Sequence, residues 1–453
     1  MADTDEHSEM VGAEPASGRD DPYAQLHPPA PETLAATGLS FDLMLQLLMK
    51  TLHLGGELTG THLASRLGVL FGVIEPVLDF LKREHQVEII GGGMIGGAAY
   101  RYRITDAGRS RALLFLEHNH YVGKAPVPLA QYRDYMRRFA AVPPARISPS
   151  RVRKAFSHLV LSDRVLDQLG PAITAGQSMF IYGPPGNGKT VISTAIGGLL
   201  AGQIAIPAAI EVEGSIITVF DPVNHQPLPT VDRSDAIDSH GADDDRWIRC
   251  RRPMVVVGGE LSLADLDLSY NPTTGFYHAP VQAIANGGVL VIDDFGRQRC
   301  APTELLNRWV VPLENRVDFL TLNTGQKLEL PFRAMVVFAT NIKPRDLVDE
   351  AFLRRIHYKI FAESPTIEDF MQIFEDCCQH AEVPFDRPVV EEMLSRYYRP
   401  RNIAMRGCQP RDLLNHVISL ADYFARPREL SFDLLEAACA SYFVDEEEPP
   451  PHA

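Results

Sequence analysis

The stretch SMFIYGPPGNGKTVISTAIGGLL, residues 178–200, constrains the fold of this chain more than any other. A short apolar strand ends at Tyr182, a glycine-rich loop GxxxxGKT runs from Gly183 to Thr190, and an apolar helix follows. Glycines leave the backbone free to turn successive N–H groups inward at the positive end of a helix, where they bind phosphate oxygens. The flanking strand and helix therefore favour a phosphate-binding loop over a simple glycine turn.

Each position of this loop is a candidate nucleotide contact. The predicted nucleotide-binding residues are Gly183, Pro184, Pro185, Gly186, Asn187, Gly188, Lys189 and Thr190. We expect Lys189 to reach the terminal phosphates and the hydroxyl of Thr190 to bind Mg²⁺.

A second motif, GGVLVIDDFGR at residues 287–297, is a buried-type strand that ends in two aspartates. Asp293 is predicted to hold Mg²⁺, directly or through water, and Asp294 to polarise an attacking water. Aspartate is shorter than glutamate by one methylene, roughly 1.5 Å of reach, which weakens this role unless the site shifts. The pair therefore leaves open whether the chain hydrolyses a nucleotide or only binds one.

With these motifs in place, the chain from about 155 to 425 resembles the AAA+ ATPases, which implies ATP as the nucleotide. RAMVVFATN (333–341) resembles the sensor-one strand and places Asn341 beside the terminal phosphate. DEAFLRRIHYKI (349–360) resembles the segment whose arginines, here Arg354 and Arg355, reach the nucleotide of an adjacent subunit. GCQPRDLLNHV (407–417) resembles the sensor-two helix, with Arg411 as the coupling residue. The expected catalytic residues are Asp294, Asn341, Arg354, Arg355 and Arg411.

A predicted hairpin precedes the sensor-one strand. VDFLTLNTGQKLEL (317–330) has the pattern of two strands about a turn at Asn323 to Gly325. This arrangement resembles the AAA+ branch of magnesium-chelatase subunits, MoxR-type ATPases and bacterial enhancer-binding activators, although the activator loop GAFTGA is absent. The resemblance implies a homo-oligomeric ring that acts on a protein or protein complex. Tyr270, Phe276 and Tyr277 are candidates for gripping such a substrate, with core packing as the alternative.

Residues 40 to 120 resemble a winged-helix domain, with three helices, a two-stranded wing and a further helix. Such domains suggest DNA, but the helix expected to enter the groove carries Glu75 and Asp79, and the region holds eight basic and eight acidic residues. Phosphate binding requires an excess of Lys and Arg. A protein-contact or regulatory module is therefore favoured over a DNA reader.

The basic segment 131–154 carries seven basic residues with interleaved aromatics, which favours a solvated connector or packing against a neighbouring acidic surface, with a nucleic-acid contact as the alternative. The acidic, proline-rich ends account for most of the net charge of −15 and are expected to be disordered. The six cysteines show no CxxC spacing, and neither a secretory signal nor an apolar run of about 20 residues is present, so a cytoplasmic protein without membrane insertion is expected.

The predicted fold class is α/β, with a P-loop NTPase AAA+ core of parallel sheet and C-terminal helical lid, preceded by an α+β winged-helix domain. The predicted segments are an acidic arm (1–39), a winged-helix-like domain (40–120), a basic linker (121–154), the α/β nucleotide-binding domain (155–362), the lid (363–444) and an acidic tail (445–453). The leading hypothesis is an ATP hydrolase that binds Mg-ATP and remodels a protein complex. The alternatives are a DNA-associated ATPase and a nucleotide-gated scaffold with little turnover.

Overall fold

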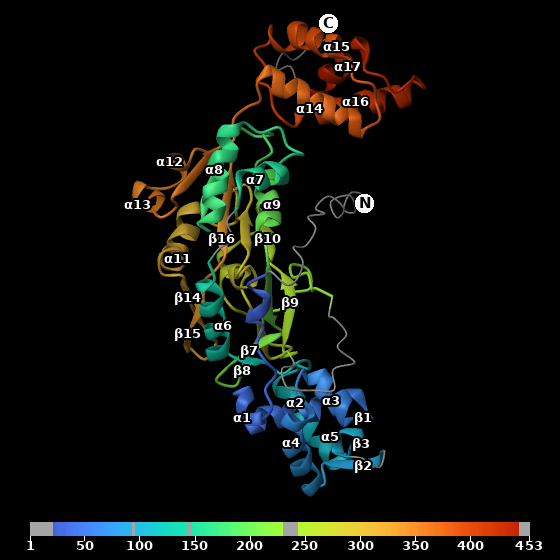
Figure 1. Cartoon of the computed structure of the whole chain (residues 1–453), viewed down its shortest axis with the longest axis vertical. Coiled ribbons are helices and arrows are strands. Elements are labelled where there is room, and N and C mark those ends of the chain that lie inside the picture. Colours follow the sequence, from blue (N-terminus) through green and yellow to red (C-terminus); the bar gives the residue numbers. More distant parts are fainter. Residues whose placement is uncertain (1–20, 93–95, 144–146, 230–242, 444–453) are drawn as a thin grey trace, which may run out of the picture. The chain divides into compact units, whose positions relative to one another are not determined.

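The structure, a computed structural model, describes residues 21–92, 96–143, 147–229 and 243–443 (Figure 1). The chain divides into two compact units. The first consists of Met1–Ala145, Leu200–Val291 and Gln298–Val336, and the second of Arg146–Leu199, Ile292–Arg297 and Val337–Ala453. All predicted residues of the nucleotide site belong to the second unit. The predicted acidic ends lie largely outside the described residues.

The first unit begins with a helical region around a small sheet. Its elements are α2 (Phe41–Gly55), β1 (Leu58–Thr59), α3 (Gly60–Leu67), α4 (Phe71–Arg83), β2 (Val87–Gly92), β3 (Tyr100–Ile104) and α5 (Asp106–His118). Ser40, Thr59 and Thr105 cap α2, α3 and α5, because each hydroxyl accepts a backbone N–H of the first turn. The strands pair antiparallel in the order β1-β3-β2. The helices and the hairpin lie where the sequence predicts them, and the assignment to the winged-helix family stays a prediction.

The rest of the first unit is rich in short strands. A five-stranded sheet has the order β11-β12-β8-β7-β4, and two further pairs are β6 with β9 and β14 with β15. The strands are β4 (Val127–Pro128), β6 (Gln203–Pro207), β7 (Ala209–Val212), β8 (Ser215–Thr218), β9 (Trp247–Arg251), β11 (Ser269–Asn271), β12 (Phe276–His278), β14 (Val317–Thr321) and β15 (Lys327–Pro331). The pair β14 and β15 is the predicted hairpin, and Gly325 takes a positive φ of 83° in its turn.

Helix α6 (Leu129–Ala141) fills much of the basic segment 131–154. Its side chains Tyr132, Tyr135 and Phe139 are buried, and the hydroxyl of Tyr135 accepts the N–H of Ala205 at 2.7 Å. These aromatic rings are core residues of the first unit, so they do not offer faces on which nucleic-acid bases could stack.

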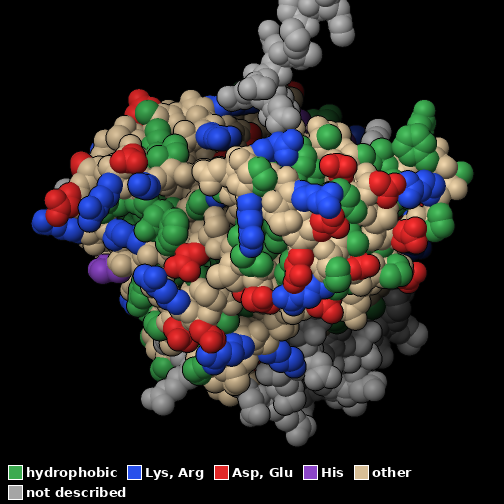
Figure 2. Space-filling view, turned by 90° about the horizontal axis from the view of Figure 1, so that it is seen from above, with side chains coloured by type: hydrophobic (Ala, Val, Ile, Leu, Met, Phe, Trp, Pro, Cys, Tyr) green, Lys and Arg blue, Asp and Glu red, His purple; other side chains and the backbone are tan. Residues whose placement is uncertain are grey.

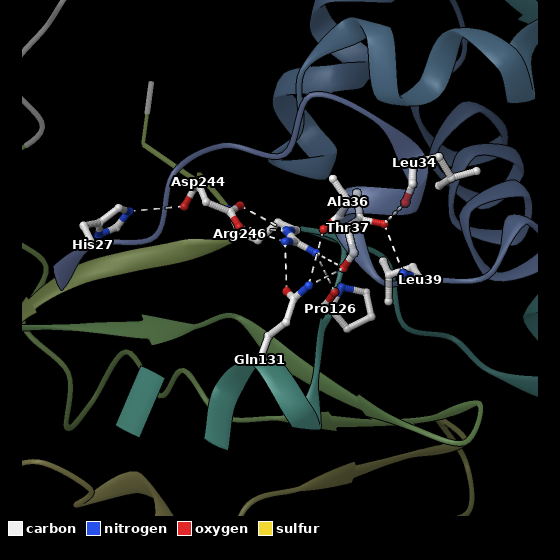
Figure 3. Close-up of polar contacts among 9 residues, drawn as sticks. All are labelled: His27, Leu34, Ala36, Thr37, Leu39, Pro126, Gln131, Asp244 and Arg246. Atoms are coloured by element: carbon white, nitrogen blue, oxygen red, sulfur yellow. Dashed lines mark hydrogen bonds and ion pairs between the residues drawn. The ribbon is translucent and has the colours of Figure 1, made fainter. Parts of the chain in front are cut away.

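A buried arginine joins three segments of the first unit (Figure 3). Arg246 and Asp244 are each only 2% exposed, and Nη2 of the arginine lies 2.8 Å from Oδ2 of the carboxylate. The same guanidinium donates to the carbonyl of Thr37 at 3.1 Å and to Oε1 of Gln131 at 3.3 Å. Arg246 therefore holds the chain before α2, helix α6 and the start of β9 together through one buried guanidinium, whose charge Asp244 balances.

The second unit contains the strand, loop and helix of the glycine-rich motif. β5 (Met179–Tyr182) pairs in parallel with both β16 (Met335–Thr340) and β17 (Tyr358–Phe361). The strand order of the sheet is β10-β13-β16-β5-β17, in which β10 (Met254–Val257) and all of β13 (Val289–Ile292) except Ile292 are assigned to the first unit. The other helices of this region are α7 (Pro149–Ala155), α8 (Asp163–Thr174), α9 (Lys189–Leu199), α12 (Pro344–Leu347) and α13 (Glu350–Leu353). The prediction of a mixed α/β fold with parallel strands beside the glycine-rich loop is confirmed.

A group of four helices follows β17 and has its own apolar core (orange to red in Figure 1). The helices are α14 (Ile367–His380), α15 (Arg387–Met393), α16 (Gln409–Tyr423) and α17 (Phe432–Tyr442). Phe370, Phe374, Leu413 and Leu435 are fully buried in this core. This group corresponds to the segment that the sequence analysis assigns to a lid.

Candidate nucleotide-binding site

The glycine-rich loop leaves the carboxyl end of β5 and enters α9 at Lys189. Gly183, Gly186 and Gly188 have φ values of 153°, 78° and 69°, a range that side chains other than glycine rarely adopt. A Cβ at Gly183 would also lie 2.4 Å from the carbonyl oxygen of Ala362. The glycine pattern is thus required by the backbone itself, and it brings the loop to the edge where ligands bind in open α/β sheets.

Lys189 is only 7% exposed, and its Nζ donates to the carbonyl of Pro184 at 2.8 Å, across its own loop. Burial lowers the pKa of Lys189, while the carboxylates of Asp294 and Asp293 act in the opposite direction. A desolvated ammonium interacts strongly with an anion, because little water competes for it. The carbonyl of Pro184 offers this cation only a dipole. Phosphate oxygens bound in the loop would offer it a full negative charge.

Thr190 and Asp293 lie side by side at the start of α9 and the end of β13. The hydroxyl of Thr190 donates to Oδ2 of Asp293 at 2.8 Å, although the two residues are 103 positions apart in the chain. A hydroxyl and a carboxylate are hard oxygen ligands of the kind that Mg²⁺ binds while it keeps several waters. The residues present therefore fit Mg²⁺ at this point.

Asp294 has a left-handed backbone with φ of 47°, a conformation that asparagine and aspartate tolerate better than longer side chains do. Its N–H donates to Oδ1 of Asp293 at 3.0 Å, and Nδ2 of Asn341 donates to Oδ1 of Asp294 at 3.4 Å. Oδ1 of Asn341 is buried without a hydrogen-bond partner among the described residues. Two carboxylates and an amide oxygen therefore converge beside the loop, and the amide oxygen has an unused lone pair.

The predicted arginines have different surroundings. Arg354, at the end of α13, is 77% exposed and lies 3.4 Å from Glu350 of its own helix, and Arg355 follows it. Arg411, near the start of α16, is 69% exposed and pairs with its neighbour Asp412 at 3.2 Å. None of the contacts described for Arg354 or Arg411 joins it to the glycine-rich loop.

A segment just before α16 does contact that loop. The N–H of Cys408 donates to the carbonyl of Gly186 at 2.8 Å, and the N–H of Gly407 donates to Oδ1 of Asn187 at 3.3 Å. Arg406 donates from Nη1 to the hydroxyl of Ser364 at 3.0 Å, and its charge acts on Lys189. The sequence analysis missed Arg406, although it lies one residue before the motif that was used to choose Arg411.

We expect Arg406→Ala to weaken nucleotide binding about tenfold, because it removes the cation that acts on the loop from the helical group. Arg411→Ala is the matched comparison and should change binding less than about threefold, since its charge is exposed and already paired. Binding of a fluorescent nucleotide analogue compares the two variants. A larger loss in Arg411→Ala than in Arg406→Ala would support the coupling role predicted for Arg411.

The known proteins that resemble this chain are remote relatives. Residues 366–441 match the model of a family described as a domain of unknown function, DUF8689. No curated protein sequence matches the chain. A solved structure of the RuvB Holliday junction branch migration motor of Thermotoga maritima is 13% identical, with 68% of this chain and 74% of that chain covered and a TM-score of 0.36. A structure of NtrX from Brucella abortus in complex with ADP is 13% identical, with 76% and 68% covered and a TM-score of 0.40. At such values these similarities carry no inference about activity.

Two surface features bear on partners. On the face drawn in Figure 2, basic and acidic side chains are interspersed. A surface that binds the phosphate backbone of a nucleic acid instead carries a patch of mostly basic side chains. Among the helices of the described residues, none has the length and apolar character that crossing a bilayer requires.

Proposed function

We propose that this chain is an AAA+ ATPase that binds Mg-ATP, hydrolyses it to ADP and phosphate, and uses the cycle to remodel a protein or protein complex. The observation that carries the proposal is the contact between Thr190 and Asp293 at the mouth of a loop that holds a desolvated Lys189. This set joins a phosphate cradle, a cation and two hard oxygen ligands within one unit. The resemblance of the ordered sequence motifs to those of AAA+ ATPases supports ATP as the substrate.

In this mechanism the chain mainly positions groups and stabilises charge. The N–H groups of residues 183–190 and the ammonium of Lys189 bind the phosphates, and Mg²⁺ held by Thr190 and Asp293 would neutralise charge on phosphate oxygens. Asp294 orients the attacking water and accepts its proton as the bond between the terminal phosphorus and the ADP oxygen breaks. Asn341, which already donates to Asp294, keeps that carboxylate in place and offers its amide oxygen to the water.

The exposed Arg354 and its neighbour Arg355 support assembly into a homo-oligomeric ring. An arginine on a helix end, 77% exposed, is accessible to the nucleotide of a second copy. Arginines supplied in this way contribute about 10³-fold or more to phosphoryl transfer. We therefore propose that turnover per subunit rises with protein concentration and that Arg354→Ala/Arg355→Ala loses this rise.

The Asp294→Asn variant tests hydrolysis against binding alone. Asparagine also tolerates a positive φ, so the backbone is retained while the proton acceptor is lost. We expect phosphate release to fall at least about 100-fold with ATP binding within about threefold of the parent. Phosphate release and binding of a fluorescent ATP analogue are measured across protein concentrations, with Asp346→Asn, an exposed aspartate of α12, as the control.

The opposite outcome is also informative. Equal phosphate release by Asp294→Asn and the parent would contradict the assigned base. No turnover in the parent at any concentration, with ATP still bound, would instead favour the nucleotide-gated scaffold. The DNA-associated alternative is not supported by the residues of α6, because their aromatic rings are buried.

A further inference from the structure

The first unit contains a cavity of about 520 Å³ that shares no residue with the nucleotide site. Its walls come from α2, the chain after α5, the turn before β8, strands β11 and β12, and the turn of the β14–β15 hairpin. Of the described residues that line it, none is an aspartate or a glutamate. The cavity therefore has no negative side chain of its own.

A buried lysine supplies its positive charge. Lys50 of α2 is only 1% exposed, and its Nζ donates to the carbonyl of Asn119 at 3.0 Å. Within the described part of the chain, no carboxylate forms an ion pair with this ammonium. Burial lowers the pKa of Lys50 to about 8, so the charged form still dominates at pH 7. A buried ammonium without a counter-ion is unfavourable, and it favours any anion that enters beside it.

The lysine is held in a wall that hydrogen bonds keep in place. Asn119 donates from Nδ2 to the carbonyl of Gly275 at 3.1 Å, while its Oδ1 accepts the N–H of Tyr121 at 2.7 Å. Gly275 has φ of 72°, and a Cβ there would lie 2.4 Å from the carbonyl of His118. The chain after α5 and the turn between β11 and β12 are thus closely packed, so Lys50 is presented by a preformed surface.

Two tyrosines complete the site, and one of them also offers a hydroxyl proton. The rings of Tyr270 and Tyr277 lie 4.8 Å apart and supply an apolar wall. The hydroxyl of Tyr277 accepts the N–H of Asn323 at 3.0 Å, and no described residue accepts its own proton. A second donor besides Lys50 therefore lines the cavity.

We propose that this cavity binds a small aromatic monocarboxylate, with Lys50 and the hydroxyl of Tyr277 at the carboxylate and the tyrosine rings against the apolar part. One ammonium balances one negative charge, whereas a phosphate dianion is typically bound by several cations or by an arginine fork. Because the walls include α2 and the β14–β15 turn, an occupied cavity joins the helical region of the first unit to its hairpin. This site is independent of the proposed ATPase activity.

The test uses sodium benzoate with the full-length chain at pH 7 and constant ionic strength, and saturation-transfer NMR of the benzoate protons as the readout. Benzamide has the same shape without the charge and serves as the matched ligand control. We expect saturable transfer with a Kd in the millimolar range for benzoate, and at least about tenfold weaker binding of benzamide.

Variants separate this site from general anion binding. Lys50→Met should weaken benzoate binding at least about tenfold, and Tyr277→Phe about fivefold. Lys327→Met removes an exposed lysine of β15 in the same unit and should leave binding unchanged. Since Lys50→Met removes an unpaired buried charge, the variant should remain folded, and its tryptophan fluorescence on heating checks this. Tyr277→Phe provides an independent test if it does not.

Three results would overturn the proposal: no saturable transfer to benzoate, equal binding of benzamide, or unchanged binding in both Lys50→Met and Tyr277→Phe. Competition with inorganic phosphate gives the remaining arm. An inhibition constant for phosphate below the Kd of benzoate itself would assign the cavity to phosphate groups and refute the monocarboxylate. ATP turnover has no part in these measurements, so a failure here leaves the nucleotide site untouched.

Discussion

Replacement of Lys189 by alanine is expected to lower ATP turnover by at least about 10²–10³-fold. The ammonium is buried against the carbonyl of Pro184, and Lys189 itself belongs to the loop, at the first residue of α9. Alanine leaves the backbone N–H groups of the loop in place, so the loss is that of charge at the terminal phosphates. Phosphate release and binding of a fluorescent ATP analogue separate the loss of turnover from the loss of affinity.

Lys154→Ala is the matched control for this variant. Lys154 is an exposed lysine of α7 in the same unit, and its removal should change turnover less than about twofold. Thermal unfolding should show that Lys189→Ala is as stable as the parent, because a desolvated cation is removed together with its burial penalty. Full turnover in Lys189→Ala would place the nucleotide elsewhere in the chain and would contradict the proposed function.

The second large effect concerns Arg246. Its loss in Arg246→Ala leaves the carboxylate of Asp244 buried and without its partner, which typically lowers the free energy of unfolding by about 3–5 kcal/mol. The carbonyl of Thr37 and the amide oxygen of Gln131 lose a donor at the same time. Both tryptophans of the chain, Trp247 and Trp309, are buried in the first unit, so urea unfolding followed by tryptophan fluorescence reports on that unit.

A nearby arginine provides the control. Arg249 pairs with Asp243 at 2.5 Å, but its side chain is 33% exposed and that of Asp243 is 36% exposed. Arg249→Ala should therefore lower the free energy of unfolding by no more than about 1 kcal/mol. In the double variant Arg246→Met/Asp244→Leu no charge is left buried, and part of the lost stability should return. Equal effects of Arg246→Ala and Arg249→Ala would show that burial does not distinguish the two pairs.

Local patterns in the sequence were sufficient for the phosphate loop, for the strand before Asp293 and for one hairpin of the first unit. The phosphate loop follows from glycines whose positive φ values the turn requires, and the strand before Asp293 follows from its apolar run. The β14–β15 hairpin was predictable from its turn residues. In each case the information lies within about a dozen neighbouring residues, so no distant contact has to be known.

Other parts of the first unit show where such patterns fail. Tyr132, Tyr135, Met136 and Phe139 have the spacing of a buried helix face. The arginines between them led instead to the prediction of a solvated connector or a nucleic-acid contact. The parallel pairing of β4 with β7 joins segments about 80 residues apart, and two-residue strands carry no periodicity of their own. Burial of Arg246 depends on three distant segments that meet around it, which no local pattern reveals.

The same limit explains the site residues. Arg411 lies inside one motif and Arg406 lies one residue before it. The choice between them depends on where α16 begins and on the neighbour Asp412, which pairs with Arg411. The motif can be recognised in the sequence, but the direction in which each side chain points cannot. The roles of Asp294, Arg354, Arg355 and Arg411 stay predictions that the variants above test, and the role of Asn341 also stays a prediction.

The contacts of Gly407 and Cys408 with the phosphate loop have a thermodynamic consequence. The carbonyl of Gly186 and the amide of Asn187 are parts of that loop, and they are also hydrogen-bond partners of the helical group. A nucleotide that changes the free energy of these bonds changes the equilibrium position of the group. By linkage, any partner that binds the helical group and alters the same bonds must change nucleotide affinity by the factor by which nucleotide changes the partner's own affinity.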